Sequence, residues 1–320
     1  MRLVAIAAAV SLLAGIARAD KPKSVVERDV VDVAPAKGVE IDAVHIDNRL
    51  GKVTVKGHDS AGVSIVAVKR APDDETMDRL KISLVPDPAG PVHINTSLIV
   101  VDEGRPVKAG SIRIDLVVYI PRKARIDATT WNDDVTLADL DNGGGVTTNE
   151  GDIAVSNCAG EIETHAAQGA QRFSEVFGKL DAEGISGEMD IETVKGDRLG
   201  ARMHDGTIAA RKVRSREVEL RTTSGDIDFD GEAVAGGTVY IASYSGDVRM
   251  TFRAGSSVRV EALSKRGTIA AVGIETTRKG RRVIGTYGGG RNSAGVKMMT
   301  NLGNIDLNVR VGLVDDTAEF

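Results

Sequence analysis

The stretch Ser224-Gly225-Asp226-Ile227-Asp228-Phe229 carries the pattern that decides the fold. A small polar residue precedes a glycine and a polar residue, and apolar side chains then alternate with polar ones. Similar stretches recur at residues 186–191, 245–250 and 302–307. Neighbouring side chains on a strand point to opposite faces, so an alternation with a period of two predicts short β-strands rather than helices.

The glycines of this pattern are regularly spaced along the second half of the chain. The series is Gly151, Gly169, Gly187, Gly206, Gly225, Gly246, Gly267, Gly285 and Gly303. Seven of these nine glycines have an aliphatic residue two positions later, whereas Gly169 and Gly285 do not. Their period of about 20 residues is typical of stacked units that are each too small to bury an apolar face.

The expected fold class is therefore all-β, a parallel β-solenoid with a less regular N-terminal β region. Each coil would contribute two short strands that pair in parallel with the next coil. Glycine at each corner would supply left-handed backbone without a Cβ clash. We expect four segments: a signal peptide at residues 1–19, an N-terminal β region at 20–125, the repeat solenoid at 126–310 and a C-terminal tail at 311–320.

Helical signals are confined to one short segment of the N-terminal region. Residues 73–80 begin with acidic residues suited to capping and predict one or two helical turns. The surrounding segments, such as the alternating run at residues 112–120 that ends before Pro121, have the pattern of longer strands.

Composition fits a narrow core. The chain has 36 glycines but only ten aromatic residues, and Trp131 is its single tryptophan. Large aromatic rings supply much of the buried area in conventional cores, so Val, Ile, Leu and Ala must fill this one. Cys158 is the only cysteine, which excludes an intrachain disulfide. We interpret it as a small buried hydrophobic residue rather than a reactive thiol.

The first residues have the pattern of a secretory signal peptide. Arg2 precedes an apolar run at residues 3–16, and Ala17-Arg18-Ala19 forms an Ala-x-Ala cleavage site. The run is shorter than the roughly 20 residues of a membrane-spanning helix, and no later run is long enough, so we expect no transmembrane segment. An uncleaved N-terminal anchor is the alternative. The sequence predicts an exported protein that is periplasmic, secreted or at the cell surface.

The charge balance argues against a nucleic-acid partner. Without residues 1–19, which contain two arginines and no acid, the chain has 39 basic and 46 acidic side chains and a net charge of −7. A general nucleic-acid-binding protein needs a basic balance to neutralise phosphates.

Aspartates follow several corner glycines. Stacking would align Asp152, Asp226 and Asp247 into an acidic ladder with the oxygen chemistry that calcium prefers. Like charges in adjacent coils would also repel, and Glu188, Thr207 or Thr268 interrupt the series. We interpret these aspartates as acceptors for turn amides and predict no metal site.

Catalytic chemistry finds little support in the sequence. Asp190, Asp228 and Asp306 are carboxylates at polar strand positions, but they are scattered one per coil, and aromatic platforms for sugars are nearly missing. The histidines show no metal-ligand spacing, and we interpret them as isolated surface or turn residues: His45, His58, His93, His165 and His204. We predict no catalytic residue, no cofactor and no metal.

Two basic runs and the C-terminal residue have alternative interpretations. Residues 122–125 and 278–282 are rich in Arg and Lys, and the second run suits either a solvated loop or an anionic surface glycan or lipid. Phe320 is typical of outer-membrane barrels, but its acidic neighbours and the lack of lipid-facing strands argue against one.

Several motifs together resemble the DUF4097 family of bacterial adhesin-like proteins. They are the recurring Ser-Gly-Asp-Ile phrase, Asn-x-x-Gly-x-Val-x-Val at residues 48–55, Tyr119-Ile120-Pro121, Gly288-Gly289-Gly290 and Asn301-Leu302-Gly303-Asn304-Ile305. The resemblance covers roughly residues 25–310. It implies a right-handed parallel β-solenoid in the cell envelope or outside the cell, with no established catalytic residue or cofactor. At residues 132–135 the chain departs from the pattern, because Asp133 replaces the glycine.

The leading functional hypothesis is an exported, non-catalytic, adhesin-like solenoid that presents a surface to an envelope or surface macromolecule, either protein or glycan. The alternatives are a polysaccharide-active β-helix enzyme and a purely structural envelope scaffold.

Overall fold

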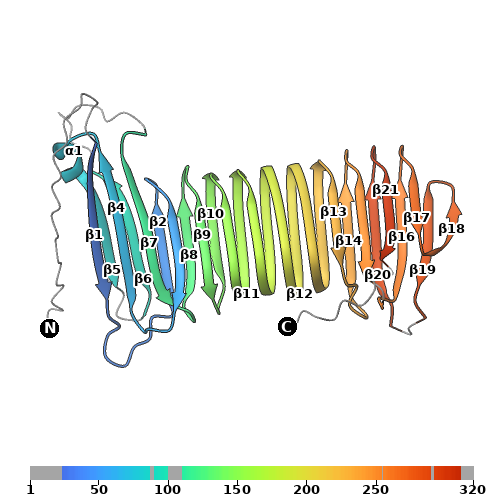
Figure 1. Ribbon diagram of the computed structural model, residues 1–320, viewed down its shortest axis with the longest axis horizontal. Coiled ribbons are helices and arrows are strands. Elements are labelled where there is room, and N and C mark those ends of the chain that lie inside the picture. The colour runs from blue at the N-terminus through green and yellow to red at the C-terminus, as the bar shows by residue number, and fades with distance from the viewer. Residues whose placement is uncertain (1–23, 87–89, 100–109, 254, 290–291, 311–320) are drawn as a thin grey trace. The chain divides into compact units, whose positions relative to one another are not determined.

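A computed structural model describes residues 24–86, 90–99, 110–253, 255–289 and 292–310 (Figure 1). These residues are nearly all in β-strands, and the chain divides into two compact units after Asn149. The predicted signal peptide at residues 1–19 and the tail at 311–320 lie outside the described residues. The predicted class, an all-β parallel solenoid with a less regular N-terminal region, is confirmed.

The elements of the first unit, in chain order, are β1 (Val25–Val33), β2 (Ala43–Asn48), β3 (Val53–His58), β4 (Val63–Ala71), α1 (Asp74–Arg79), β5 (Leu80–Pro86), β6 (Val92–Leu98), β7 (Arg113–Pro121), β8 (Arg125–Thr130), β9 (Val135–Leu140) and β10 (Gly144–Glu150). Those of the second unit are β11 (Ile153–Gln168), β12 (Gln171–Ser224), β13 (Ile227–Gly231), β14 (Thr238–Ser243), β15 (Val248–Arg253), β16 (Val258–Ser264), β17 (Ile269–Val272), β18 (Glu275–Lys279), β19 (Arg282–Tyr287), β20 (Ala294–Thr300) and β21 (Ile305–Arg310).

The first unit has two rows of paired strands. One row runs β5–β6–β2–β8–β10, and the other runs β1–β4–β7–β3–β9. The inner pairs are parallel, whereas β5–β6, β1–β4 and β4–β7 are antiparallel. Strands β2 and β3 therefore form a short coil early in the chain. The segment from β4 to β7 then leaves this coil, and its strands β6 and β7 pair along one edge of β2 and β3. The chain returns at β8, which pairs with the other edge of β2.

The predicted helical turns form α1. Asp73 is its N-cap, and its side chain accepts a hydrogen bond of 2.7 Å from the Thr76 amide. Such a side-chain acceptor satisfies one of the amides that lack a partner in the first turn of a helix. The helix is short because Leu80 already has extended backbone and begins β5.

The second unit is the regular part of the solenoid. Strand β11 pairs in parallel with the start of β12, one coil further along the chain, so that Ile153 lies beside Gln171 and Ile162 beside Leu180. Strand β12 is long because its extended backbone continues through successive coils. Two rows continue from it, one of β13, β15, β21 and β17, and one of β14, β20, β16, β19 and β18 (Figure 1).

The order of the last coils differs from the order predicted from glycine spacing. The coil β20–β21 lies between β14–β15 and β16–β17, so Gly303 stacks between Gly246 and Gly267. Gly285 is not a corner at all, because it lies in β19, which pairs antiparallel with β16 and β18. A regular spacing reports the length of each unit but not which unit becomes its neighbour, and the prediction was wrong here.

Corner glycines are required mainly by the close approach of adjacent coils. A Cβ on Gly187 would lie 2.1 Å from the carbonyl oxygen of Gly169, and the φ of Gly187 is +136°. The left-handed backbone predicted at the corner glycines is present at Gly151, Gly169, Gly187, Gly206 and Gly225, whose φ values lie between +129° and +154°. Five residues other than glycine also have positive φ, between 50° and 62°: Asp139, Asn157, Glu175, Thr193 and Lys212. Residues with a Cβ rarely adopt this conformation, so the packing of the coils must hold these five residues in a backbone conformation that they do not prefer locally.

Buried hydroxyl groups join the corners of successive coils. Thr222 donates to the carbonyl of Gly206 at 3.0 Å, and Ser243 donates to that of Gly225 at 3.0 Å. The series continues with two more bonds, Thr300 to Gly246 at 3.0 Å and Ser264 to Gly303 at 2.9 Å. Each donor lies three residues before its own corner glycine. These bonds satisfy carbonyls that the turn removes from the strand ladder.

The corner at Asp133 keeps these bonds although it lacks glycine. Thr130 and Thr148 donate to its carbonyl at 2.8 and 3.3 Å. Its carboxylate meets a guanidinium nitrogen of Arg113 at 2.7 Å. Partial burial raises the pKa of Asp133, and the charge of Arg113 opposes that rise without cancelling it.

The core of the second unit is narrow and aliphatic, as composition predicts. Phe173 and Phe252 are its largest fully buried side chains. Cys158 is fully buried, in agreement with its interpretation as a small core residue. The polar pair Thr164 and Gln171 is also buried, and the Thr164 hydroxyl lies 2.6 Å from the side-chain oxygen of Gln171. Such internal bonding removes the cost of burying their polar atoms.

Candidate functional site

The outer face of the second unit carries charged side chains in rows that run across the coils. The ladder places Glu161 beside Lys179, Glu163 beside Asp181 and His165 beside Glu183. The following coils add three arginines and two glutamates that join these rows through ion pairs. We call the set the charged panel: Glu161, Glu163, His165, Lys179, Asp181, Glu183, Arg198, Arg202, Glu217, Glu219 and Arg221.

Arg198 is the centre of the panel. Its Nε lies 3.1 Å from Asp181, one terminal nitrogen lies 3.0 Å from Glu219, and the other pairs with Glu217. Only 24% of its side chain is exposed, against 15% for Glu219. Because these charges are largely shielded from water, removing one partner should cost more than at a typical surface ion pair.

Glu219 collects two further guanidinium groups. Arg202 reaches it at 3.3 Å while also contacting Glu183 at 2.8 Å, and Arg221 reaches it at 2.6 Å. Arg221 also lies over the ring of Tyr240, 4.7 Å from its centroid, in the geometry of a cation–π contact. The network therefore fixes arginine side chains that would otherwise be mobile.

A glycine in the middle of the panel makes room for this network. A Cβ on Gly200 would lie 2.1 Å from Oδ1 of Asp181, so the carboxylate occupies the space of the missing side chain. The surface is hollow at this point, with a volume of about 450 Å³. Its lining is entirely polar and charged: Glu163, His165, Lys179, Asp181, Glu183, Arg198 and Arg202.

The network favours the charged forms of Asp181, Glu219 and Lys179. Partial burial raises the pKa of Asp181, but hydrogen bonds from Lys179 and Arg198 outweigh it and the pKa lies below its ordinary value. Burial is likewise outweighed at Glu219, where nearby arginines lower the pKa. The hydrogen bond to Glu161, followed by that to Asp181, raises the pKa of Lys179. At neutral pH these three groups therefore place fixed charges of both signs in the panel.

The sequence interpretation missed the panel, although a signal for it exists. Glu161, Lys179, Arg198 and Glu217 follow one another at the spacing of the corner glycines, which is the length of one coil. Residues separated by one coil length occupy equivalent positions in adjacent coils, so this spacing predicts that the four side chains are neighbours. The strand pairing and the ion pairs show the same neighbours.

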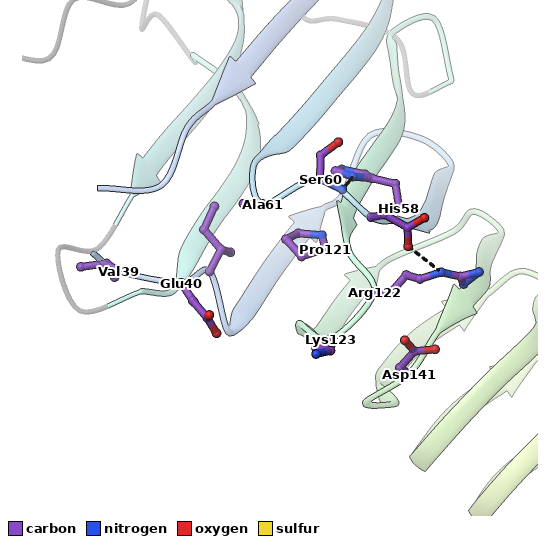
Figure 2. A pocket seen from close by; sticks show the side chains of 11 residues that line it. Val39, Glu40, His58, Ser60, Ala61, Pro121, Arg122, Lys123 and Asp141 are labelled. Atoms are coloured by element: carbon purple, nitrogen blue, oxygen red, sulfur yellow. Dashed lines mark hydrogen bonds and ion pairs between the residues drawn. The ribbon is translucent and has the colours of Figure 1, made fainter. Parts of the chain in front are cut away.

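A second hollow lies within the first unit, at the turns after β3 and β7 (Figure 2). Its volume is about 330 Å³. Figure 2 shows Arg122 and its ion-pair contact, which joins its Nε to Asp59 at 3.4 Å, and Arg122 also donates to the Asp139 carbonyl at 2.9 Å. Lys123, Glu40 and Asp141 add further charges to the lining.

His58 and Ser60 in this hollow do not form a nucleophile and its base. Nδ1 of His58 accepts a hydrogen bond of 2.8 Å from the backbone amide of Ser60, so that nitrogen is engaged by the turn. An activated serine requires its hydroxyl, rather than its amide, at the histidine nitrogen. The hydrogen bond shapes the turn after β3.

The corner aspartates bind backbone amides of the neighbouring coil. Asp152 accepts from the Ala170 amide at 2.9 Å, Asp226 from the Asp247 amide at 2.8 Å, and Asp247 from the Asn304 amide at 2.8 Å. Within the described part of the chain, no group of three or more His, Cys, Asp or Glu residues is placed to hold a metal ion.

A guanidinium also lies among two of these corner aspartates and the strand residue Asp228. Arg249 approaches Asp226 at 3.7 Å, Asp228 at 3.3 Å and Asp247 at 3.7 Å. The hydrogen bond to Asp228 is the main cause of the raised pKa of Arg249. A fixed cation therefore relieves the repulsion expected along this acidic ladder.

The other acids singled out by the sequence lie in separate coils. Asp190 pairs with Arg211 at 2.8 Å, and Asp306 lies beside Arg249 in the ladder of β15 and β21. Each of these two acids therefore lies beside an arginine of a neighbouring coil, and Asp190 forms an ion pair with it.

The histidines are less isolated than the sequence predicts. The rings of His45 and His93 stack with centroids 4.8 Å apart, because β2 and β6 pair in register, and His45 contacts Asp127 at 3.3 Å. His165 contacts Glu183 at 3.3 Å. The prediction of isolated histidines was wrong for His45 and His93, which are distant in sequence and become neighbours through the excursion of β4–β7.

Among the described residues, no helix has both the length and the apolar character needed to cross a membrane.

Comparison with known proteins gives a family match over most of the chain. The model of the family described as Toastrack DUF4097 matches residues 46–308. No curated protein matches the sequence.

Several solved structures are similar at low sequence identity. A putative adhesin from Bacteroides fragilis is 9% identical, with 90% of this chain and 98% of that chain covered and a TM-score of 0.40. A putative lipid binding protein from Parabacteroides distasonis is 10% identical, with 88% and 96% covered and a TM-score of 0.42. A putative cell adhesion protein from Clostridium sporogenes is 14% identical, with 91% and 100% covered and a TM-score of 0.25.

Proposed function

The chain belongs to the Toastrack DUF4097 family, and from that premise we propose that it is an exported, non-catalytic, adhesin-like solenoid that binds an envelope or extracellular macromolecule through the charged panel. The carrying observation is the network around Arg198 and Glu219, which fixes charged groups of both signs around a polar hollow on the outer face. Side chains that are already ordered lose less entropy when a partner binds.

The panel chemistry suits a polar partner. Carboxylates of Asp181 and Glu183 accept hydrogen bonds, and the guanidinium of Arg202 donates them, within one hollow. Such a mixed set recognises hydroxyl, amide and carboxylate groups, which both glycans and protein surfaces offer. A nucleic-acid partner would find no excess positive charge there, because three acidic and three basic side chains line the hollow.

The test compares panel variants with a matched control in the full exported chain. The double variant Arg202→Gln with Arg221→Gln removes two exposed panel charges, and Arg211→Gln with Lys212→Gln removes two charges that pair with Asp190 and Glu192 elsewhere. Binding is measured on a glycan array and by cross-linking to envelope fractions, with circular dichroism as the folding control. We expect at least a tenfold loss of binding for the panel variant and little change for the control.

Two outcomes would overturn the proposal. Release of reducing sugar from a polysaccharide by the wild-type chain would favour the enzyme alternative. Full function after clean excision of residues 187–205, which span one coil and include Arg198 and Arg202, would favour a purely structural scaffold.

A further inference from the structure

The hairpin β18–β19 brings a second basic segment against a corner of the solenoid. Arg278 donates to the Ile269 carbonyl at 2.9 Å, and Arg281 donates to the Lys265 carbonyl. These bonds hold the hairpin tip beside the turn between β16 and β17. We call the combined cluster the basic end: Lys265, Arg266, Arg278, Lys279, Arg281 and Arg282.

The basic end is exposed and poorly neutralised. All six residues are exposed to solvent. Within the described residues, an ion pair is formed only by Arg282, which meets Glu261 at 3.2 Å. Arg278 and Arg281 donate hydrogen bonds to backbone carbonyls. These bonds hold the like charges close together but do not neutralise them. Such clustering costs free energy through repulsion, which an anionic surface would relieve.

Apolar side chains lie next to this cluster on the same column of corners. Gly303 stacks on Gly267, which places Leu302 in the coil adjacent to Arg266, and the Leu302 amide donates to the Tyr244 carbonyl at 3.2 Å. Leu302 is 46% exposed and Tyr244 is 56% exposed. The column therefore runs from an exposed aromatic ring through an exposed aliphatic side chain to a dense group of cations.

We propose that the basic end, with Leu302 and Tyr244, docks on the surface of an anionic lipid bilayer. Lys and Arg attract anionic headgroups, while Leu and Tyr gain by entering the interface. A hydrated anionic glycan would satisfy the cations equally but would offer nothing to Leu302, which is why the bilayer is favoured. This inference goes beyond the proposed function, because it concerns a different surface from the charged panel.

The test measures binding of the full chain to vesicles by flotation. One set of vesicles contains equal parts of phosphatidylglycerol and phosphatidylcholine, and the other contains phosphatidylcholine alone. We expect binding to the anionic vesicles only, weakened by added salt because salt screens the charges.

Two variants separate the parts of the docking surface. Lys265→Gln, Arg266→Gln and Lys279→Gln together remove three charges without touching the hydrogen bonds of Arg278 and Arg281. Since each cation near an anionic surface contributes about 1 kcal/mol, we expect affinity to fall about 100-fold. Leu302→Ser should lower it about tenfold through lost burial alone.

A matched control removes three charges from ion-paired positions. Arg172→Gln, Arg211→Gln and Lys212→Gln lie at Asp152, Asp190 and Glu192 and should leave vesicle binding almost unchanged. Equal losses in the control and the test variant would show a non-specific charge effect and overturn the proposal.

Soluble dextran sulfate distinguishes the other polyanion source. Tight binding of dextran sulfate that is indifferent to Leu302→Ser, with no binding to anionic vesicles, would overturn the bilayer assignment in favour of a glycan. Panel variants should bind vesicles like the wild type, so either proposal can fail alone.

Discussion

The charged panel and the basic end use the same residue types in one unit but differ in their partners. In the panel, Arg198, Arg202 and Arg221 each contact at least one carboxylate, and Glu219 joins all three. In the basic end, six cations share Glu261 through Arg282 alone, in the part of the chain that the structure describes. The difference shows that the neighbouring coil decides the role of a basic residue. A carboxylate beside it makes the residue part of an ion-pair network, whereas without one its charge is available to bind a partner.

The largest expected effect comes from breaking the coils that carry the panel. A Cβ at Gly206 would lie 1.9 Å from the Gly187 carbonyl oxygen, so Gly206→Val must push two coils apart. We expect a loss of about 3 kcal/mol in the free energy of unfolding, measured by urea denaturation.

The control for this variant is another glycine on a strand. Gly295→Val in β20 meets no heavy atom within 4 Å and places a good strand former on an exposed position. It should leave stability unchanged or slightly higher. A similar loss in both variants would show that the approach of the coils at Gly206 is not the cause.

Removal of the shared panel carboxylate should have the next largest effect. Glu219→Gln leaves three guanidinium groups around a neutral amide, and we expect a loss of about 1–2 kcal/mol in urea denaturation. Glu217→Gln is the milder control because Glu217 is half exposed. Equal stability of Glu219→Gln and the wild type would remove the distinction between the panel and an ordinary charged surface.

The pH dependence sharpens the same point. The folded pKa of Glu219 lies below its ordinary value of 4.5, and that of Asp181 lies below 3.8. Their ionised forms therefore stabilise the fold above these values, and this stability is lost as the pH falls through the folded pKa values. Thermal melts between about pH 5 and 3 should show a shallower decline for Glu219→Gln than for the wild type.

The smallest expected effect has the opposite sign. Lys279→Gln in the basic end removes one of several repelling charges, and we expect a slight gain in stability, below about 0.5 kcal/mol. The gain should disappear at high salt, where repulsion is already screened. A clear loss of stability in a low-salt thermal melt would mean that Lys279 has a stabilising partner, and the contrast between the two regions would fail.

The solenoid could be predicted from sequence because its corners leave a local trace. The spacing of Gly151, Gly187 and Gly225 follows from the need for two backbones to approach closely at each turn. Gly285 lacks a hydroxyl three residues earlier, where Arg282 stands, but the true corners Gly169, Gly187 and Gly206 lack it as well, so this pattern alone does not exclude Gly285.

The order of the coils and the candidate site could not be predicted as directly. Two coils of similar length are equally good neighbours by spacing, and their order depends on packing between segments that are distant in sequence. The stacking of His45 on His93 and the contacts of Arg198 arise in this way, because strands of different coils pair in register. Local patterns contain the members of such contacts but not their pairing.

The insertion of β20–β21 between two earlier coils has a consequence for how the protein is made. Strands β14 and β15 gain their outer partners only when residues 294–310 arrive, so synthesis from the N-terminus leaves their edges open until those residues have been made. Pairing of β14 with β20 is slower than pairing with the next coil, because the longer loop that contains β15–β19 must close first. Residues 294–310 therefore cover the edges of β14 and β15, and a chain cut off before residue 294 would leave these strand edges exposed and able to pair with other chains.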